Sequence, residues 1–236
     1  MRLTREVRDT WLQHEQRSHG RKNGYVTKGQ AERLDKWLPK ISLHREDRVQ
    51  DKIPRDVLLG VEIGFGNGEF LAELTQQYPE YYFVGVEIYL PGIAKAISRL
   101  DACDNIERVR VSQLPAQYVL AQQVEPNSVD MIHVNHPDPW PKKKHHHRRI
   151  IQKEFANVLA SRLKLGGILS LASDIDELAI WMRDILDEVP DLVNEAGKGG
   201  FVPRPEGRIV TKFEERGMKA ERISQFLRYR KVGANT

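Results

Sequence analysis

One short segment of this sequence carries side chains that suit the binding of a nucleic-acid base. Asp138 and Trp140 alternate with prolines in P-D-P-W-P, and the basic run K-K-K-H-H-H-R-R over residues 142–149 follows directly. Proline fixes its own φ and keeps the preceding residue out of the helical region, so the acid and the indole stand on a stiff, extended segment. An acid, an aromatic ring and a cationic block suit a planar base on a polyanion, with Trp140 either stacking on the base or packing under the loop. The alternative is a proline-rich surface turn.

A second group of residues has the spacing of a nucleotide-cofactor site. Glu62 is followed by glycines at alternate positions, Gly64, Gly66 and Gly68, and Glu87 closes the next apolar run. Glycines between a strand and a helix permit a tight turn and close approach of a ligand to the backbone. A dinucleotide fingerprint requires a glycine at position 69, where this chain has glutamate. An acid at the amino end of a helix disfavours a pyrophosphate, which binds at that end.

These acids favour a nucleoside cofactor without phosphates, and S-adenosylmethionine is the natural candidate. It has a sulfonium, an ammonium and a ribose diol. Glu62 is expected to face the positive part of the cofactor, and Glu87 falls where the acid that holds ribose hydroxyls normally lies. A purely structural glycine turn is the alternative, although it would not require acids at both positions.

The same residues argue against a metal site. His145, His146 and His147 are adjacent, and adjacent side chains point in different directions on either a strand or a helix, so they cannot converge on one ion. The single cysteine, Cys103, excludes an intrachain disulfide and a cysteine-rich zinc site. We therefore expect no metal.

An alternation of strands and helices must position these side chains. The hydrophobic pattern predicts strands at 57–63, 82–86, 108–111, 129–134 and 167–172, and helices from 69 and at 90–100, 116–123, 150–163 and 174–188, the last capped by Asp174. Two later strands, near Leu192 and at 225–231, are expected to close one edge. This order predicts an α/β fold with a mostly parallel seven-stranded sheet and helices on both faces. Ligands bind at the carboxyl ends of such strands, where Glu62, Glu87 and Asp138 fall.

Composition limits the class of protein. The chain has 236 residues, of which 30% are charged and 40% hydrophobic, and a formal net charge of +4. No apolar run approaches the roughly 20 residues needed to span a bilayer, and the charged amino terminus does not resemble a signal peptide. We expect a cytoplasmic protein that does not enter a membrane.

The first 50 residues differ from the rest. They are expected to form a basic amino-terminal arm and a short helix at 27–38, followed by one domain over 51–236. Basic residues concentrate in three patches, at 17–28, 142–149 and 216–231. These patches could line one groove for a polyanion, or each could be an ordinary solvated face.

Several motifs together resemble a known family. V-E-I-G-F-G-N-G-E-F, G-V-E-I, P-D-P-W-P-K-K-K-H-H-H-R-R and T-K-F-E-E-R-G are similar to those of the bacterial tRNA (guanine-N7)-methyltransferases, and R-S-H-G-R-K-N-G-Y-V-T-K-G-Q near the start is as well. The resemblance implies a Rossmann-like class I S-adenosylmethionine-dependent fold. It also implies methyl transfer to N7 of the guanine at position 46 in the tRNA variable loop, with tRNA as the partner.

The resemblance also implies roles for individual residues. Asp138 would be catalytic, and cofactor contacts would come from Glu62, Gly64, Gly66, Gly68, Glu87, Gln113 and Leu114. Substrate contacts would come from Lys142, Asp174, Thr211, Lys212, Phe213 and Glu214. RNA contacts would come from Lys143, Lys144, His145, Arg148 and Arg149.

Three departures from the family pattern keep alternatives open. Gln113 or Leu114 stands where the family usually has an aspartate facing adenine, Asn135 and His136 replace aromatic or aliphatic residues before P-D-P-W, and the sequence after Gly217 differs. The alternatives are a related methyltransferase with another RNA or small-molecule substrate, and a non-catalytic RNA-binding module. The sequence leaves the choice between monomer and homodimer open.

Overall fold

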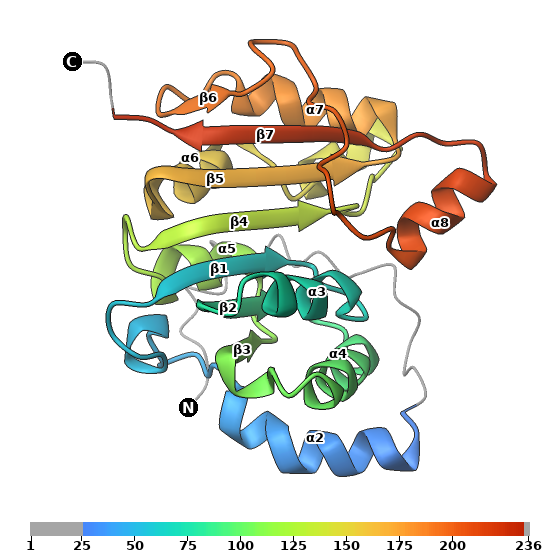
Figure 1. The fold of residues 1–236 in the computed structure, drawn as a ribbon. Helices are drawn as coiled ribbons and strands as arrows, with labels where there is room; N and C mark the ends of the chain where they lie inside the picture. Colours follow the sequence, from blue (N-terminus) through green and yellow to red (C-terminus); the bar gives the residue numbers. More distant parts are fainter. Residues whose placement is uncertain (1–25, 234–236) are drawn as a thin grey trace.

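The computed structural model describes residues 26–233, which form a seven-stranded sheet in the order β3-β2-β1-β4-β5-β7-β6 (Figure 1). Its strands are β1 Leu58–Ile63, β2 Tyr81–Val86, β3 Val109–Ser112, β4 Val129–Asn135, β5 Leu163–Ser173, β6 Leu192–Asn194 and β7 Gln225–Lys231. Neighbouring pairs among β1 to β5 are parallel, whereas β7 runs antiparallel to both β5 and β6. The predicted α/β fold with a mostly parallel seven-stranded sheet is confirmed.

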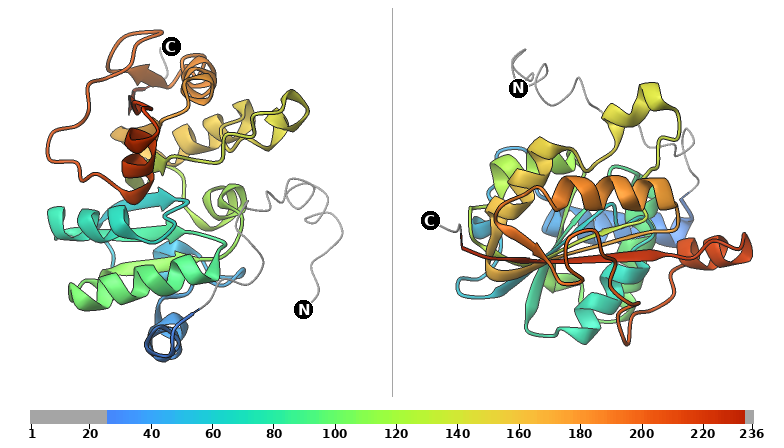
Figure 2. Two further views of the ribbon diagram at one scale, coloured as in Figure 1. Left: turned by 90° about the vertical axis from the view of Figure 1, so that its right-hand side faces the viewer. Right: turned by 90° about the horizontal axis from the view of Figure 1, so that it is seen from above.

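Helices cover both faces of this sheet (Figure 2). One face carries α2 Lys28–Ile41, α3 Glu69–Gln77 and α4 Leu90–Ala102, and the other carries α5 Ala116–Tyr118, the π-helical turn η4 Val119–Gln123, α6 Lys153–Arg162 and α7 Asp176–Leu186. Two buried clusters correspond to the two faces, because alternate residues of each strand point to opposite sides. Between residues 26 and 233, no helix is both long enough and apolar enough to cross a bilayer.

The predicted helix near the start of the chain packs on the main sheet domain. Thr27 caps α2 in a capping box with Gln30, and Trp37 donates from Nε1 to Asp101 of α4 at 2.8 Å. The backbone N–H of Leu43 then donates to Val111 of β3 at 2.8 Å. Residues 28–43 are therefore built into the domain, and the predicted basic arm lies mostly in residues 1–25, outside the described part of the chain.

Two predicted boundaries around α6 are wrong. α6 begins at Lys153 rather than 150, because hydrogen bonds fix the preceding residues: Trp181 donates to the Ile151 carbonyl at 2.8 Å, and the Gln152 amide donates to the Arg149 carbonyl at 3.0 Å. β5 begins at Leu163 rather than 167, since residue 163 pairs with Val129 ahead of a register shift. Local periodicity does not record these pairings.

The predicted cap of the following helix is also wrong. Ile175, not Asp174, is the N-cap of α7, and it makes no side-chain cap. The Asp174 carboxylate instead accepts a hydrogen bond from Arg222 at 2.8 Å. Arg222, which is distant in the sequence, therefore binds the Asp174 carboxylate that was expected to cap α7.

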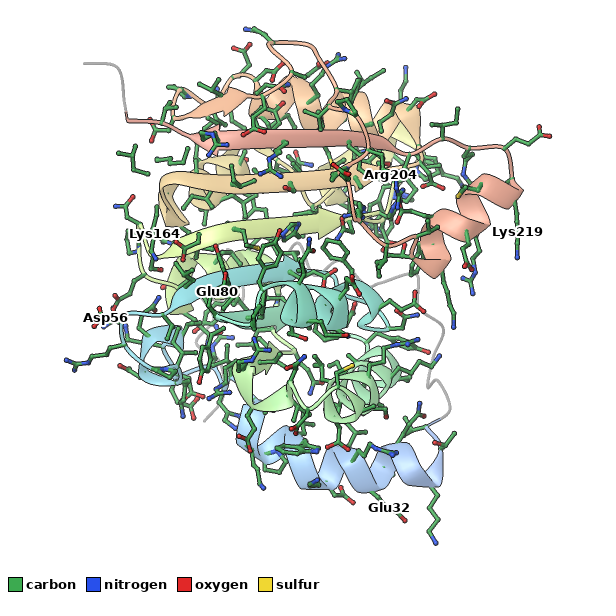
Figure 3. All side chains as sticks on the ribbon, viewed as in Figure 1. Glu32, Asp56, Glu80, Lys164, Arg204 and Lys219 are labelled. Atoms are coloured by element: carbon green, nitrogen blue, oxygen red, sulfur yellow. The ribbon has the colours of Figure 1, made fainter. Side chains whose placement is uncertain are left out.

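The parallel strands all end at one edge of the sheet, where α8 Lys212–Lys219 lies beyond the arrowheads of β1, β4 and β5 (Figure 1). Arg204 lies near this edge, whereas Lys164 lies at the opposite end of the strands (Figure 3). Short 3₁₀ turns complete the described chain: η2 Val49–Asp51, η3 Ile106–Arg108 and η5 Lys143–Arg148. This arrangement places the loops that follow β1, β2 and β4 together.

Gly68 is required by both backbone conformation and packing. Its φ is +72°, and a Cβ built on it would stand 2.3 Å from the Cβ of Ala96 in α4. We expect Gly68→Ala to lower the free energy of unfolding by about 3 kcal/mol or more, since it adds a left-handed backbone penalty to an overlap between α3 and α4.

Gly64→Ala is the matched control for Gly68→Ala. Gly64 has the same φ of +72° but nothing within 4 Å of its Cβ position, so only the backbone cost of about 1 to 2 kcal/mol remains. Urea unfolding of both variants measures the difference, and equal losses would contradict the packing argument.

Candidate active site at the carboxyl edge of the sheet

The glycine loop between β1 and α3 is built from left-handed glycines and closed by a carboxylate. Gly64, Gly66 and Gly68 have φ of +72°, +56° and +72°. One oxygen of Glu87 accepts from the Gly66 N–H at 2.9 Å and the other accepts from the Tyr89 N–H at 2.8 Å. Glu87 thereby ties the end of β2 to the loop that follows β1.

A second carboxylate lies at the amino end of α3. Glu69 pairs with Arg99 at 3.0 Å and accepts from the backbone N–H of Lys212 at 2.9 Å. Glu69 therefore occupies the end of the helix at which a pyrophosphate would otherwise bind. The geometry therefore agrees with a cofactor that has no phosphate groups.

Glu62 is the most unusual carboxylate of the site. It is 2% exposed, and burial raises its pKa to about 8, although Asn135 and the charge of Arg208 oppose the shift. Its Oε1 accepts from the Asn135 amide at 3.3 Å, whereas Oε2 has no hydrogen-bond partner among the described residues. A buried carboxylate oxygen without a donor is costly unless a ligand supplies one, so this position fits a cationic group.

Glu87 and Asp138 share one electrostatic environment. Burial raises the pKa of Glu87, the backbone N–H groups of Tyr89 and Gly66 oppose that shift, and the charge of Asp138 adds to it. The loops after β2 and β4 are therefore close enough for their acids to interact, as the shared carboxyl edge predicts.

The segment that carries Asp138 has a strained residue at each end. His136 and Trp140 have φ of +46° and +43°, values that bulky side chains rarely adopt. The His136 N–H is fixed to the Ala172 carbonyl at 2.8 Å, and the intervening prolines stiffen the chain. Such strain persists only where the surroundings impose it and is typical of functional loops.

Trp140 packs under this loop. Its side chain is 4% exposed, the Arg148 guanidinium lies over its ring at 4.9 Å, and the His145 ring meets it edge-on at 5.8 Å. Of the two alternatives for this indole, the structure shows the packing one.

The prediction that Arg149 contacts RNA is wrong. Its side chain is 2% exposed, it pairs with Glu177 at 2.7 Å, and it donates to the Pro139 carbonyl at 3.0 Å. The guanidinium also lies over the Trp181 ring at 4.9 Å. Arg149 is therefore a structural clamp that holds the P-D-P-W-P segment against α7.

The preceding lysines remain available to a polyanion. Lys142, Lys143 and Lys144 are exposed and lead into or form η5, while Arg148 and His145 are half-buried beside Trp140. The third basic patch contributes less, because most of its charges are paired: Arg222 with Asp174, Arg228 and Arg230 with Glu195, and Lys231 with Asp191. Among the described residues, free positive charge near Asp138 therefore concentrates at residues 142–144.

The T-K-F-E-E-R-G motif forms the start of helix α8, which was not predicted from the sequence. Thr211 is its N-cap and forms a capping box with the buried Glu214. The signal was present, since Thr followed three residues later by Glu is a signature of a helix start. Thr211 and Glu214 are thus hydrogen-bonded to each other.

The exposed residues of α8 lean over the glycine loop. Phe213 is 53% exposed, and its ring edge lies 3.7 Å from the point where a Cβ on Gly66 would stand. The Lys212 ammonium lies 3.5 Å from Glu69. These residues are brought to the cofactor loop from more than half the chain away.

Asp174 links the end of β5 to α8. Burial raises its pKa, but the Arg222 hydrogen bond and the nearby His136 bring it below the ordinary value. His136 Nδ1 lies 3.5 Å from its carboxylate, and a Cβ on Gly217 would stand 2.6 Å from it. The structure therefore gives this predicted substrate residue a role in seating α8.

Gln113 and Leu114 follow β3 at the same edge. Gln113 is exposed, and the Leu114 N–H donates to Ser112 Oγ at 3.3 Å. The backbone N–H of Glu87 donates to the Ser112 carbonyl at 3.0 Å, which places this turn beside Glu87.

Arg208 is a residue of this edge that was not predicted from the sequence. Its side chain is 6% exposed, and Nη2 donates to Asn135 Oδ1 at 3.0 Å. It also approaches Glu214 at 3.7 Å and lies over the Phe70 ring at 4.4 Å. A single arginine in an irregular loop carries no periodic or motif signal, so only the fold reveals its position.

Comparisons with known proteins show the family. A family model for methyltransferases matches residues 56–225. The tRNA (guanine-N(7)-)-methyltransferase of Idiomarina loihiensis is 37% identical over 204 residues, which cover 85% of this chain and 83% of that protein. The Pseudomonas aeruginosa protein of the same name is 40% identical over 200 residues, covering 82% and 80%.

Solved structures show the fold. The 16S rRNA methyltransferase KamB matches with a TM-score of 0.52 at 13% identity, covering 91% of this chain and 98% of that one. A SAM-dependent O-methyltransferase of Thermotoga maritima matches at 0.51 and 16% identity, covering 92% and 69%. At these identities the likeness concerns the fold alone.

Proposed function

Because the chain belongs to the tRNA (guanine-N7)-methyltransferase family, we propose that it transfers a methyl group from S-adenosylmethionine to N7 of a guanine in tRNA. The observation that carries this proposal is the buried Glu62 carboxylate, one oxygen of which has no partner within residues 26–233 and lies at the same strand edge as Glu87 and Asp138. These three carboxylates suit the binding of a cationic nucleoside beside a planar base.

Glu62 and Glu87 would hold the cofactor. When bound, S-adenosylmethionine supplies a methyl group activated by its sulfonium. Glu62 is placed to accept from the cationic part, and Glu87, already anchored by two backbone N–H groups, has lone pairs left for the ribose hydroxyls. The backbone of Gly64 and Gly66 allows close approach, and the turn at Gln113 and Leu114 lies where adenine would be met.

The protein's task at the acceptor is positioning. Guanine N7 has a free lone pair at neutral pH, so no base must remove a proton before it attacks the methyl group. Asp138 is assigned to accept hydrogen bonds from N1–H and N2–H of guanine, which leaves N7 directed at the methyl group. Adenine lacks this pair of donors and would leave the carboxylate unpaired.

Other residues are assigned to the RNA. Lys142, Lys143, Lys144, His145 and Arg148 would lie along the phosphate backbone, and Phe213 and Lys212 would approach the target nucleotide from α8. The variable-loop guanine at position 46 and a role for the arm follow from the motif resemblance, and a cytoplasmic location is proposed from the composition.

Transfer of labelled methyl groups to unmodified tRNA tests the function. Reduction and aniline treatment then cut the RNA at 7-methylguanine. One cut in the variable loop is expected. No label would favour a non-catalytic binding module, and label without a cut would mean that another atom is methylated.

Neutralising Lys143 and Lys144 should weaken tRNA binding in a salt-dependent way. Each phosphate contact contributes about 0.7 to 0.9 to the slope of log affinity against log salt, so the double alanine variant should lose about 1.5 from that slope. Filter binding between 50 and 200 mM salt, roughly the range where such effects are large, measures it. Lys198→Ala, which removes an exposed lysine paired with Glu188, should leave the slope unchanged.

A further inference from the structure

A chain of four polar side chains connects the cofactor edge to α8. Glu62 of β1 accepts from Asn135 of β4 at 3.3 Å, and Asn135 accepts from Arg208 at 3.0 Å. Arg208 in turn lies 3.7 Å from Glu214, the buried carboxylate in the first turn of α8. The chain thus joins two strands, a loop and a helix that are distant in sequence.

Asn135 is the central member of this chain. Its Nδ2 donates to Glu62 while its Oδ1 accepts from Arg208, so both ends of the amide are in use and only one orientation satisfies them. It is also the only hydrogen-bond donor to the Glu62 carboxylate among the described residues.

Arg208 is held firmly enough to orient this amide. Its side chain is 6% exposed, and its guanidinium lies over the Phe70 ring at 4.4 Å and the Phe226 ring at 5.4 Å. Arg204 fixes the same turn, because it donates to the Arg208 carbonyl at 3.0 Å and to Glu214 at 2.7 Å. A planar cation between aromatic rings loses little freedom when it donates, which suits a fixed support.

We propose that Asn135 is a positioning residue for methyl transfer: held by Arg208, it fixes the Glu62 carboxylate with Oε2 free for the cationic part of the cofactor. This inference rests on the proposed function. It assigns Arg208 an effect on cofactor binding that passes through Asn135 rather than through direct contact with the cofactor.

A double-mutant cycle on cofactor affinity tests the proposal. Asn135→Leu keeps the branched shape and the number of side-chain heavy atoms but removes both hydrogen bonds, and Arg208→Leu removes the support. Calorimetric titration with S-adenosylmethionine should give a Kd about tenfold higher for each single variant. The double variant should bind no more weakly than the weaker single one. In steady-state assays the KM for the cofactor should rise by a similar factor, with kcat within about threefold of wild type.

Asn105→Leu is the matched control. Asn105 also accepts from an arginine, since Arg108 Nη2 donates to its Oδ1 at 2.6 Å, but this pair lies ahead of β3, at the opposite end of the strand from the site. The control should leave the Kd for S-adenosylmethionine unchanged.

Each other outcome has a defined meaning. Unchanged affinity in folded Asn135→Leu, or a further loss when Arg208→Leu is added to it, would overturn the proposal. A wild-type protein that binds no cofactor would overturn the proposed function and this inference with it. If Asn135→Leu fails to fold, Arg208→Gln, which keeps a donor for Asn135, should bind within about threefold of wild type while Arg208→Leu does not; equal binding would overturn the proposal.

Discussion

The Glu62→Gln variant is expected to be more stable than the wild-type protein at pH 8 and to bind S-adenosylmethionine at least about 100-fold more weakly. Burial raises the pKa of Glu62 from 4.5 to about 8, so the folded protein retains a proton on this group that the unfolded chain loses above pH 4.5. Glutamine is neutral at every pH and avoids that cost, but it cannot neutralise a cationic ligand.

The sign of the pH dependence follows from the direction of the shift. The folded state binds more protons than the unfolded state between pH 4.5 and 8. The contribution of protonated Glu62 to the stability of the wild-type protein is therefore complete below this window and is lost as pH rises through it. The stability difference between Glu62→Gln and wild type should therefore grow across the window, to on the order of 4 kcal/mol.

Urea unfolding without cofactor at pH 5, 7 and 8.5, conditions chosen around that window, measures this difference. Glu206→Gln serves as a control, because Glu206 is an exposed glutamate and should show no comparable trend. A constant difference between Glu62→Gln and wild type would show that Glu62 ionises normally in the folded protein.

Replacing Asp138 with alanine is expected to lower kcat/KM for tRNA methylation by about 100- to 1000-fold. The reason is the loss of the hydrogen-bond acceptor assigned to the guanine edge, which orients N7 toward the methyl group. Cofactor affinity should change little, since Asp138 influences Glu87 only through its charge.

Labelled-methyl transfer under single-turnover conditions measures this loss, and calorimetry measures cofactor affinity. Asp184→Ala removes an exposed aspartate of α7 and should keep full activity. Methyl transfer by folded Asp138→Ala at the wild-type rate would remove Asp138 from the reaction. A rise in transfer to adenine would instead support its role in selecting the base.

Much of the fold, and the positions of the acids and glycines of the candidate site, were predictable because they depend on local patterns. Alternating apolar strands and amphipathic helices require a parallel sheet, and parallel strands bring their carboxyl ends to one edge. Glu62 lies next to the end of a predicted strand, and Glu87 and Asp138 each follow one, so their convergence needed no knowledge of packing. The glycines similarly predicted the loop whose positive φ values the structure shows.

The predicted helix and strand boundaries and the predicted helix cap that the structure corrects depend on partners distant in the sequence. Asp174 has the sequence position of a helix cap, but Arg222 lies close enough to take its carboxylate. No helix was predicted at T-K-F-E-E-R-G, although it contains a capping box, and the helix it forms is seated by Glu69 and Asp174.

The sequence by itself therefore determined the α/β architecture, the cofactor loop and the acids at the strand ends, since each depends on residues near one another in the chain. Only the tertiary structure decided that Arg148 lies over Trp140 while its neighbour Arg149 turns inward to Glu177. Likewise, it alone placed Arg208 against Asn135. The physical reason is that burial and ion pairing are set by which surfaces meet when the chain folds, and identical side chains one residue apart can meet different surfaces.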